Sequence, residues 1–470
     1  MYLKSFRVEH IKCFDDVKLD FPSGEDGSHA GWHVILGANA TGKTTLLQAM
    51  AVALVGPSPA MRLVSPSNWI RRGSASGRLQ ASFVRGKADS AEGTPRKVPY
   101  QAEFTVVGDQ PAEVDGVEYT APQIVLMGSP KDAKHRGLLK GPYAANKSGW
   151  LVCGYGAFRR FTGGAEDDLT HEPGRVGRVA SLFRESVALK RDLDWLPRLY
   201  AKSLETHSPE HESARTEYQT VRRLLDQLLP SPVRIADVDT QRVYFSAPGA
   251  ERVDLLELSD GYRSFLALVI DLLRQTADVF GSVTNQIEGG PDGALTVAAD
   301  GVVLIDEVDL HLHPTWQREL GPRLQEVFPR IQFIVSSHSP FIAQAATKDG
   351  LFVLQAAERG QPVAVRRPAP QVSGWTAEQI LLSQLFGMTE TRAPNIERLL
   401  QEHAMLRGRA KFGSLERGDK ARIEELGTEL AGLLASPGEL RKDEVDAFVK
   451  LAADKVRSAL RAEARTPSAQ

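Results

Sequence analysis

The sequence predicts an α/β fold with a mixed sheet at its core, an antiparallel β patch, a helical lateral insertion and a C-terminal helical region. A glycine-rich stretch, residues 37–45, stands between an apolar run at 34–36 and a helix-like run at 46–54. A phosphate-binding loop requires this order of strand, turn and helix start. A second apolar run, 301–305, ends in two acids. This pattern is typical of a parallel strand that is buried on both faces.

Composition places the chain among ordinary globular proteins and excludes several function classes. Its 470 residues are 42% hydrophobic and 25% charged, and the formal net charge is −2, so the whole chain is not a nucleic-acid polycation. The two cysteines, Cys13 and Cys153, indicate neither a disulfide framework nor a zinc site, and they fit a reducing compartment. The apolar stretches are too short to span a bilayer, and the N-terminus lacks a signal-peptide core. We therefore expect a cytoplasmic protein without a membrane partner.

Residues 1–177 are predicted to form the first part of the core domain, with the phosphate loop. Apolar residues alternate at 79–83 and 100–106, which predicts the antiparallel patch. Glycine, proline and serine predict loops at 88–97 and 128–149. The second of these is basic, and it is either a solvated loop or a contact to a phosphate or a partner.

Composition and periodicity divide the rest of the chain into a helical lateral insertion, the second part of the core and a C-terminal helical region, over residues 178–232, 233–370 and 371–470. The helical pattern of the insertion is too short for a long coiled coil. In the C-terminal region Thr376 and Gln379 resemble a capping box. Apolar stripes at helical spacing follow, the last of them over 445–456.

The loop at 37–45 carries residue types that bind nucleotide phosphates and a metal ion. Gly37 and Gly42 let the backbone approach a phosphate closely, and the helix start that follows favours an anion. Lys43 is expected to reach the β- and γ-phosphates, and the Thr44 hydroxyl to hold Mg²⁺. The other residues expected to contact the nucleotide are Asn39, Ala40, Thr41 and Thr45. The cofactors predicted here are ATP and Mg²⁺.

Asp306 and Glu307 follow the apolar run 301–305. The carboxyl ends of parallel strands face the ligand crevice in doubly wound sheets. We therefore expect Asp306 to lie near Mg²⁺ and Glu307 to orient or deprotonate the attacking water. An acid pair after an apolar run is also compatible with a structural role, and the phosphate loop earlier in the chain favours the catalytic interpretation.

Two further stretches gain meaning from their place in the chain. Ser259, Asp260 and Gly261 begin an apolar helix, where Ser259 suits the N-cap and Gly261 permits a close backbone approach. His338 follows a buried strand at 331–335. Taken alone, these are a helix start and a strand-end histidine, which are usually structural.

Taken in order, the phosphate loop, the Leu-Ser-x-Gly stretch, the Asp-Glu strand end and the strand-end histidine resemble the ABC-type ATPases of the SMC/RecF/OLD-like branch. The resemblance covers most of residues 1–366. It implies a two-chain sandwich, in which ATP lies between the phosphate loop, or Walker A motif, of one copy and the Ser259-Asp260-Gly261 stretch of another. It also implies that His338 bonds the γ-phosphate, that Asp309 follows the Walker B acids as the D-loop residue, and that Lys12 lies near the nucleotide.

Some positions depart from the family pattern or stay open. Asp260 stands where transporters of this class have glycine. The glutamine loop is unassigned: Gln123 is a candidate by residue type, and Tyr155 and Arg159 lie in a loop that would approach the nucleotide instead. A metal pair is the alternative to a structural role for two histidines after Asp309, His311 and His313.

The stretch 374–392 looks like the C-terminal region of the Septu-type (PtuA-like) anti-phage ATPases, which work with a separate HNH nuclease. The resemblance implies an ATP-hydrolysing sensor or regulatory subunit that dimerises through its ATP sites and controls a nuclease partner. The expected partners are a second copy and an HNH-type nuclease, with a TOPRIM-like nuclease as second choice and DNA as a further candidate.

Two other functions are weighed against this one. A RecF-like DNA-repair ATPase would bind DNA directly and in a salt-dependent manner, and the near-neutral charge argues against it. A nuclease within the same chain would need a second catalytic cluster. The sequence offers no H-N-H cluster and no TOPRIM-like set of acids.

Overall fold

The structure is a computed structural model, and it describes residues 1–89, 99–109, 111–114, 116–129, 131–144, 149–159, 169, 172, 174–189, 194–290, 293–356, 361–368, 371–411 and 416–434. The chain forms two compact units, residues 1–380 and 381–470, and each is described by itself. Within the described ranges, no helix is both long enough and apolar enough to cross a membrane.

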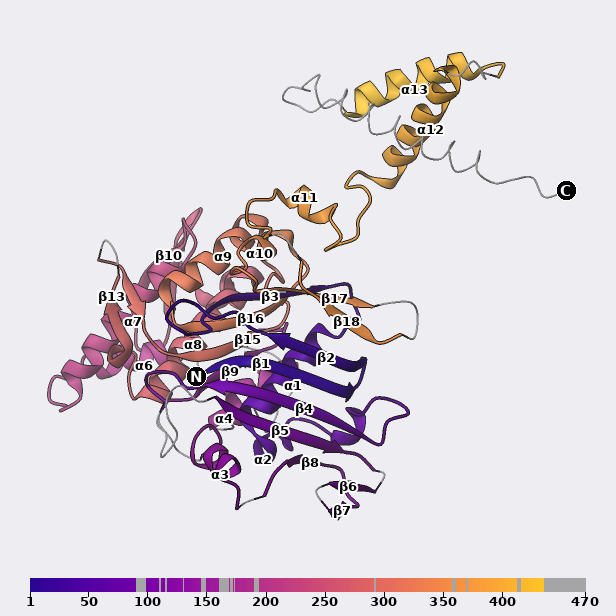
Figure 1. Ribbon diagram of the computed structural model, residues 1–470. Coiled ribbons are helices and arrows are strands. Elements are labelled where there is room, and N and C mark those ends of the chain that lie inside the picture. Colours follow the sequence, from indigo (N-terminus) through magenta and orange to yellow (C-terminus); the bar gives the residue numbers. More distant parts are fainter. Residues whose placement is uncertain are drawn as a thin grey trace. The chain divides into compact units, whose positions relative to one another are not determined.

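A six-stranded sheet, in the order β18-β17-β3-β16-β15-β9, forms the centre of the first unit. Its strands are β3 (Gly31–Gly37), β9 (Leu151–Tyr155), β15 (Gly301–Ile305), β16 (Ile331–Ser337), β17 (Leu351–Ala356) and β18 (Val363–Arg366). All neighbours are parallel except β17 and β18. β15 and β16 are buried over their whole length, as the continuous apolar sequence of β15 predicts for that strand. The carboxyl ends of β3, β9, β15 and β16 therefore meet at one edge of the sheet (Figure 1).

A second, antiparallel sheet confirms the predicted β patch, in the order β2-β1-β4-β5-β8. Its strands are β1 (Tyr2–Ile11), β2 (Phe14–Asp20), β4 (Ser76–Val84), β5 (Tyr100–Val107) and β8 (Gln123–Leu126). Helix α1 (Lys43–Val55) contacts β4 of this sheet and β3, β9, β15 and β16 of the central one. Because α1 lies between two sheets, ten of its 13 residues are buried. Its apolar sequence on all sides has this physical reason.

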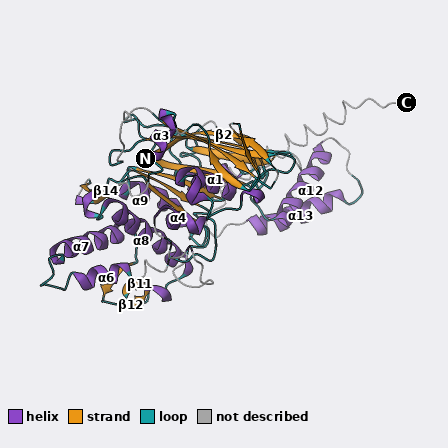
Figure 2. Cartoon of the chain, turned by 90° about the horizontal axis from the view of Figure 1, so that it is seen from below, coloured by secondary structure: helices purple, strands orange, loops and turns teal. Residues whose placement is uncertain are grey.

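The predicted lateral insertion is helical. Residues 178–232 contain η3 (Ala180–Leu182), α6 (Trp195–Lys202) and α7 (His211–Leu228), and α4 (Gly174–Val179) ends within this range. The apolar stripe of α7 is buried, and this helix contacts α6, α8 and α9. The chain then forms a small antiparallel sheet and a long helix: β10 (Arg234–Val238), β11 (Val243–Ala247), β12 (Ala250–Asp254), η4 (Leu255–Glu257) and α8 (Asp260–Phe280). Figure 2 shows α6, α7 and α8 gathered beside β11 and β12.

The sequence predicted that the basic stretch 128–149 is a loop, and this prediction was wrong for part of it. It contains α3 (Ala133–Lys140), whose first turn is capped because the Asp132 carboxylate accepts from the Lys134 N–H at 3.0 Å. The predicted loop at 88–97 falls mostly outside the described residues, and so does the predicted helical stripe at 445–456. The remaining elements of this unit are α2 (Pro57–Ala60), η1 (Pro66–Asn68), β6 (Ala112–Val114), β7 (Val117–Tyr119), η5 (Thr284–Gln286), β13 (Ile287–Gly289), β14 (Leu295–Val297), α9 (Pro314–Val327) and α10 (Pro340–Gln344).

The capping box predicted at Thr376 and Gln379 is confirmed. Helix α11 (Ala377–Leu381) follows a capping box, in which the Thr376 N–H donates to Gln379 Oε1 at 2.8 Å and the Gln379 N–H donates to Thr376 Oγ1 at 3.2 Å. The described part of the second unit contains α12 (Pro394–Lys411) and α13 (Asp419–Leu434), which pack on each other. Their buried side chains are Leu400, Leu406, Leu426 and Leu430.

His33 predicts an acid sensitivity of the fold. It is fully buried in β3, with Nε2 3.1 Å from the His29 carbonyl, and burial lowers the pKa of His33 to about 4 from an ordinary 6.5. The unfolded chain therefore binds the extra proton below pH 6.5, and the free energy of unfolding should fall by up to about 3 kcal/mol between pH 6.5 and 4 from this group. Urea unfolding across this range should show a smaller fall for His33→Gln, which stays neutral. Equal falls in both proteins would contradict the assignment.

Candidate functional site

The phosphate loop joins β3 to α1, and its surroundings require two of its glycines. Gly42 has φ +88°, and a Cβ on it would lie 2.4 Å from Cys13 Sγ. A Cβ on Gly37 would lie 2.6 Å from Thr41 Oγ1. The tip of the loop, 38–40, is exposed. The loop is therefore folded tightly at its base and presents its backbone at the tip, as a phosphate-binding turn requires.

Lys43 begins α1 and turns its ammonium back to the mouth of the loop. Its Nζ donates to the carbonyls of Gly37 at 2.9 Å and Ala38 at 3.1 Å. Burial lowers the pKa of Lys43, and three carboxylates oppose that shift, those of Asp306, Glu307 and Asp309. Gly42 is the N-cap residue of α1, and no side chain caps the helix there. Its first-turn N–H groups therefore remain donors for an anion beside a fixed positive charge.

The phosphate loop and the acidic strand end meet directly. The Thr44 hydroxyl donates to Asp306 Oδ2 at 2.6 Å, although 262 positions separate the two residues in sequence. Asp306 Oδ1 accepts from Ser336 Oγ, at the end of β16, at 2.5 Å. A hydroxyl and a carboxylate are hard oxygen ligands of the kind that Mg²⁺ prefers. Ser336 belongs to no motif of its own, and its only signal in the sequence is its place two residues before His338.

Glu307 has a left-handed backbone, with φ +44°. This conformation costs a non-glycine residue about 1 kcal/mol, and such strain gathers at functional sites. Its N–H donates to Ser336 Oγ at 2.8 Å, and its carbonyl accepts from Arg159 Nη2 at 3.1 Å. Side chains from two other elements therefore fix the backbone on both sides of the carboxylate expected to act on water.

Arg159 follows β9 and lies beneath the acidic strand end, with 5% of its surface exposed. Its Nη1 donates to the carbonyls of Asp306 at 2.7 Å and Gly156 at 3.0 Å. Burial lowers the pKa of Arg159 to about 10, against the opposite pull of nearby carboxylates, so the guanidinium stays charged at neutral pH. Tyr155 turns elsewhere, because its hydroxyl donates to Asp271 on α8 at 2.7 Å. The structure places Arg159 against the acids.

His338 and Asp309 belong to the same charged cluster. Burial and then the Lys43 ammonium lower the pKa of His338, and nearby acids oppose this, so its imidazole is neutral at neutral pH. The Asp309 carboxylate acts on Lys43, Arg159 and His338 alike. Its Oδ1 is buried without a hydrogen-bond partner. Among the described residues this unpaired oxygen marks a position where a donor would be favourable.

Ser259, Asp260 and Gly261 form the start of α8. Ser259 and Asp260 are exposed. Ser259 occupies the N-cap position of α8, as predicted, but its side chain makes no capping hydrogen bond. Gly261 is buried, and a Cβ on it would lie 2.5 Å from the His311 carbonyl. In the described part of the chain, the hydrogen bonds and ion pairs of this stretch go to Arg263 and not to the phosphate loop. His313 has a structural role, because its side chain accepts from the Thr315 N–H at the start of α9.

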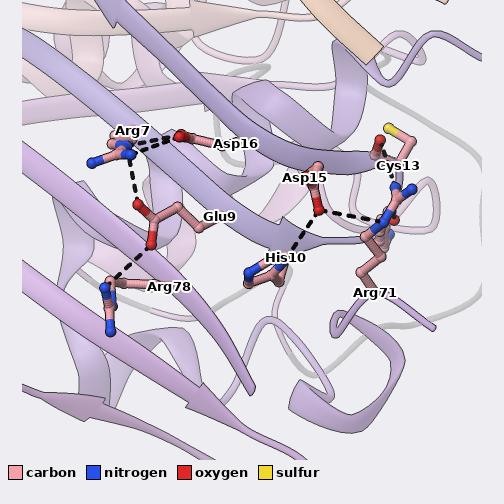
Figure 3. Close-up of polar contacts among 9 residues, drawn as sticks. Arg7, Glu9, His10, Cys13, Asp15, Asp16, Arg71 and Arg78 are labelled. Atoms are coloured by element: carbon pink, nitrogen blue, oxygen red, sulfur yellow. Dashed lines mark hydrogen bonds and ion pairs between the residues drawn. The ribbon is translucent and has the colours of Figure 1, made fainter. Parts of the chain in front are cut away.

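Lys12 lies at the turn between β1 and β2, where its ammonium is 5.4 Å from the centre of the Trp69 ring. The next residue, Cys13, contacts the Thr41 carbonyl of the phosphate loop at 3.9 Å. Figure 3 shows Arg71 at this turn, where it donates to the Cys13 carbonyl at 3.0 Å. The turn therefore adjoins the loop, and the Lys12 side chain packs on an aromatic ring. Gln123 lies in an edge strand, paired with Val107.

Two family models match the chain. One, described as "AAA domain", matches residues 5–111, which include the phosphate loop. The other, described as "AAA domain, putative AbiEii toxin, Type IV TA system", matches residues 171–343, which include Gly261, Asp306, Glu307 and His338. Both family models that match the chain are described as AAA domains. The mixed sheet brings the loop at 37–45 and the acidic strand end together, as the sequence predicts.

Relatives of the chain include the Septu protein PtuA of Bacillus mycoides (strain KBAB4), 24% identical over 86% of this chain and 47% of that protein. The Septu protein PtuA of Bacillus thuringiensis is 31% identical over 36% of this chain and 41% of that protein. The Escherichia coli "Retron Ec83 probable ATPase" is 33% identical over 34% of this chain and 27% of that protein. The chain spans less than half the length of these relatives. An SMC head bound to the C-winged helix domain of ScpA covers 78% of this chain and 98% of its own, at 14% identity and a TM-score of 0.45.

Proposed function

We propose that the chain binds ATP with Mg²⁺ at the phosphate loop and hydrolyses it, as the ATPase subunit of a cytoplasmic anti-phage defence system. The Thr44–Asp306 hydrogen bond of 2.6 Å carries the proposal. This bond joins the hydroxyl that is expected to hold the metal ion to the carboxylate that is expected to lie near the same ion. The two residues are 262 positions apart in sequence. The two oxygens fit Mg²⁺ in chemistry, and the bound ion would neutralise charge on the phosphates.

Each remaining group has a separate task in this proposal. The Lys43 ammonium and the uncapped start of α1 bind phosphate oxygens, where a positive charge and free N–H groups favour an anion. The pKa of His338 is lowered, so its imidazole stays neutral and donates a hydrogen bond to the γ-phosphate without adding a charge. Glu307 orients a water and takes its proton. Asn39, Ala40, Thr41 and Thr45 complete the loop around the nucleotide.

A second copy would complete the site. Ser259 and Asp260 are exposed at the positive end of the 21-residue helix α8, and their contacts leave them free of their own phosphate loop among the described residues. ATP between two such copies would close them together, and hydrolysis would reopen them. Lys12 lies beside the loop on the same copy and is the weaker candidate for a nucleotide contact.

The similarity to Septu PtuA supports a role in defence with a separate nuclease, of the HNH type or, as second choice, the TOPRIM type. In the described residues, no group of three histidines, cysteines or acids is placed to hold a metal ion. This observation favours an effector on another chain. The second candidate, a DNA-repair ATPase, would be favoured if the purified chain bound DNA with a strong salt dependence.

The experiment that tests the proposal uses the full chain and Lys43→Ala. We expect the wild type to bind and hydrolyse ATP with Mg²⁺ and to leave plasmid and single-stranded DNA intact. Lys43→Ala should lose ATP affinity by at least about 100-fold, because a buried charge-assisted contact of roughly 3 kcal/mol disappears. Calorimetry and phosphate release measure the two effects. Wild-type affinity in Lys43→Ala would overturn the site assignment, and DNA cleavage that tracks the purified chain would overturn the separate effector.

A further inference from the structure

The backbone of Glu307 is held in an unfavourable conformation by two side chains. At φ +44° the residue occupies the left-handed region, which L-residues with a Cβ avoid. Its peptide N–H is fixed by Ser336 Oγ at 2.8 Å, and its carbonyl by Arg159 Nη2 at 3.1 Å. Such a conformation persists only where the surroundings over-determine it. The direction of the Glu307 carboxylate therefore depends on both contacts.

Arg159 makes three hydrogen bonds to backbone carbonyls around the acid pair. One guanidinium donates to three carbonyls, those of Gly156, Asp306 and Glu307, and the first two share Nη1. It thereby connects the end of β9 with two successive peptides after β15. A planar fork of fixed N–H donors suits this task, and the single ammonium of lysine does not reproduce it.

The surroundings of Arg159 are those of an internal clamp. Its side chain is nearly fully buried, and its described hydrogen bonds go to backbone carbonyls. The neighbouring strand supports the same position, because the Tyr155 carbonyl accepts from the Asp306 N–H at 2.8 Å. Both peptides that flank the acid pair are thus tied to β9 and the loop after it.

We infer that Arg159 is a positioning residue for the reaction: it holds the Asp306 and Glu307 peptides so that the Glu307 carboxylate points at the water that attacks the γ-phosphate. The inference rests on the proposed function. It assigns Arg159 no contact with the nucleotide, and it separates this residue from Lys43, which binds phosphate. A misplacement of a reacting group by about 1 Å costs on the order of 100-fold in rate.

The test is Arg159→Lys in the full chain, with ATP affinity and turnover measured separately. We expect kcat to fall by about 10- to 100-fold while the Kd for ATP stays within about threefold. In the Glu307→Gln background, Arg159→Lys should cause no further loss, because the group that it positions is already disabled. Arg159→Gln, whose amide donates to one carbonyl, should repeat the pattern if the lysine variant does not fold.

Arg175→Lys is the matched control. Its guanidinium is also largely buried and donates to a backbone carbonyl, that of Ala144 at 3.0 Å, and its pKa responds to Arg178 and Tyr143 rather than to the site acids. Turnover should stay near wild type in this control. Wild-type kcat in Arg159→Lys would overturn the inference alone. A matching loss of ATP affinity, or a further loss on top of Glu307→Gln, would overturn it in favour of a nucleotide contact. Full turnover in Glu307→Gln would remove Glu307 from the reaction and overturn the inference with it. The proposed function itself would be overturned only if the wild-type chain neither bound nor hydrolysed ATP.

Discussion

Glu307→Gln should lower ATP turnover by about 100- to 10,000-fold and leave ATP binding intact, because the amide keeps the shape of the side chain but accepts no proton. The contacts that fix the residue come from its backbone N–H and carbonyl, and these remain in the variant. We therefore expect no change in the left-handed backbone. Phosphate release under saturating ATP measures turnover, and calorimetry measures affinity. The variant should also accumulate in the closed, ATP-bound pair.

The matched control for this prediction is Glu326→Gln, the same chemical change at an exposed position on α9. Its turnover should equal that of the wild type. If Glu307→Gln hydrolyses ATP at the native rate, Glu307 is not the base, and the strain at this residue has another origin.

The parts of the site that the sequence predicted are those fixed by local pattern. The phosphate loop requires glycine at positions where a Cβ would collide with neighbouring atoms, so Gly37 and Gly42 indicate the loop in the sequence. The strand before Asp306 is a continuous apolar run because it is buried between parallel neighbours. Parallel pairing then brings the ends of β3 and β15 to one edge of the sheet, with only β16 between them. Local pattern and simple topology are enough to place Thr44 beside Asp306.

The contacts that the sequence could not predict depend on register or on backbone groups. Ser336 meets Asp306 because β16 pairs with β15 so that Val335 lies opposite Ile305. Nothing in the residues themselves fixes that register. Arg159 binds carbonyls, which every residue type has, so its role leaves no sequence pattern. The position of Lys12 near the nucleotide is predicted from resemblance alone, and no sequence pattern indicates the contact of its ammonium with Trp69, which is distant in sequence.

The misread helix α3 shows a different limit. Its basic sequence contains Gly137 and lies between glycine-rich stretches, so composition indicated a loop. The informative signal was Asp132, which caps the Lys134 N–H at 3.0 Å. A helix of eight residues offers little periodicity, and capping then outweighs composition.

Mixing two inactive variants should restore ATPase activity if the site is completed by a second copy. Ser259→Arg leaves the phosphate loop intact, and Ser259 is exposed, so arginine there should not disturb the fold. Lys43→Ala leaves Ser259 intact. A mixed pair then has one site with both defects and one with neither. Random pairing in an equal mixture makes half of the pairs mixed, so activity should return to roughly a quarter of wild type.

The control for this experiment is a mixture of Lys43→Ala with Glu307→Gln. Both residues belong to the same copy's half of the site, because the Lys43 ammonium feels the Glu307 carboxylate within one chain. Each site of that mixed pair keeps one defect, so no activity should return. Subunit exchange is verified in both mixtures with two different tags. Exchange without recovery in the first mixture would show that each chain completes its own site. If the sites were shared, every mixed pair would contain one intact site and would hydrolyse ATP.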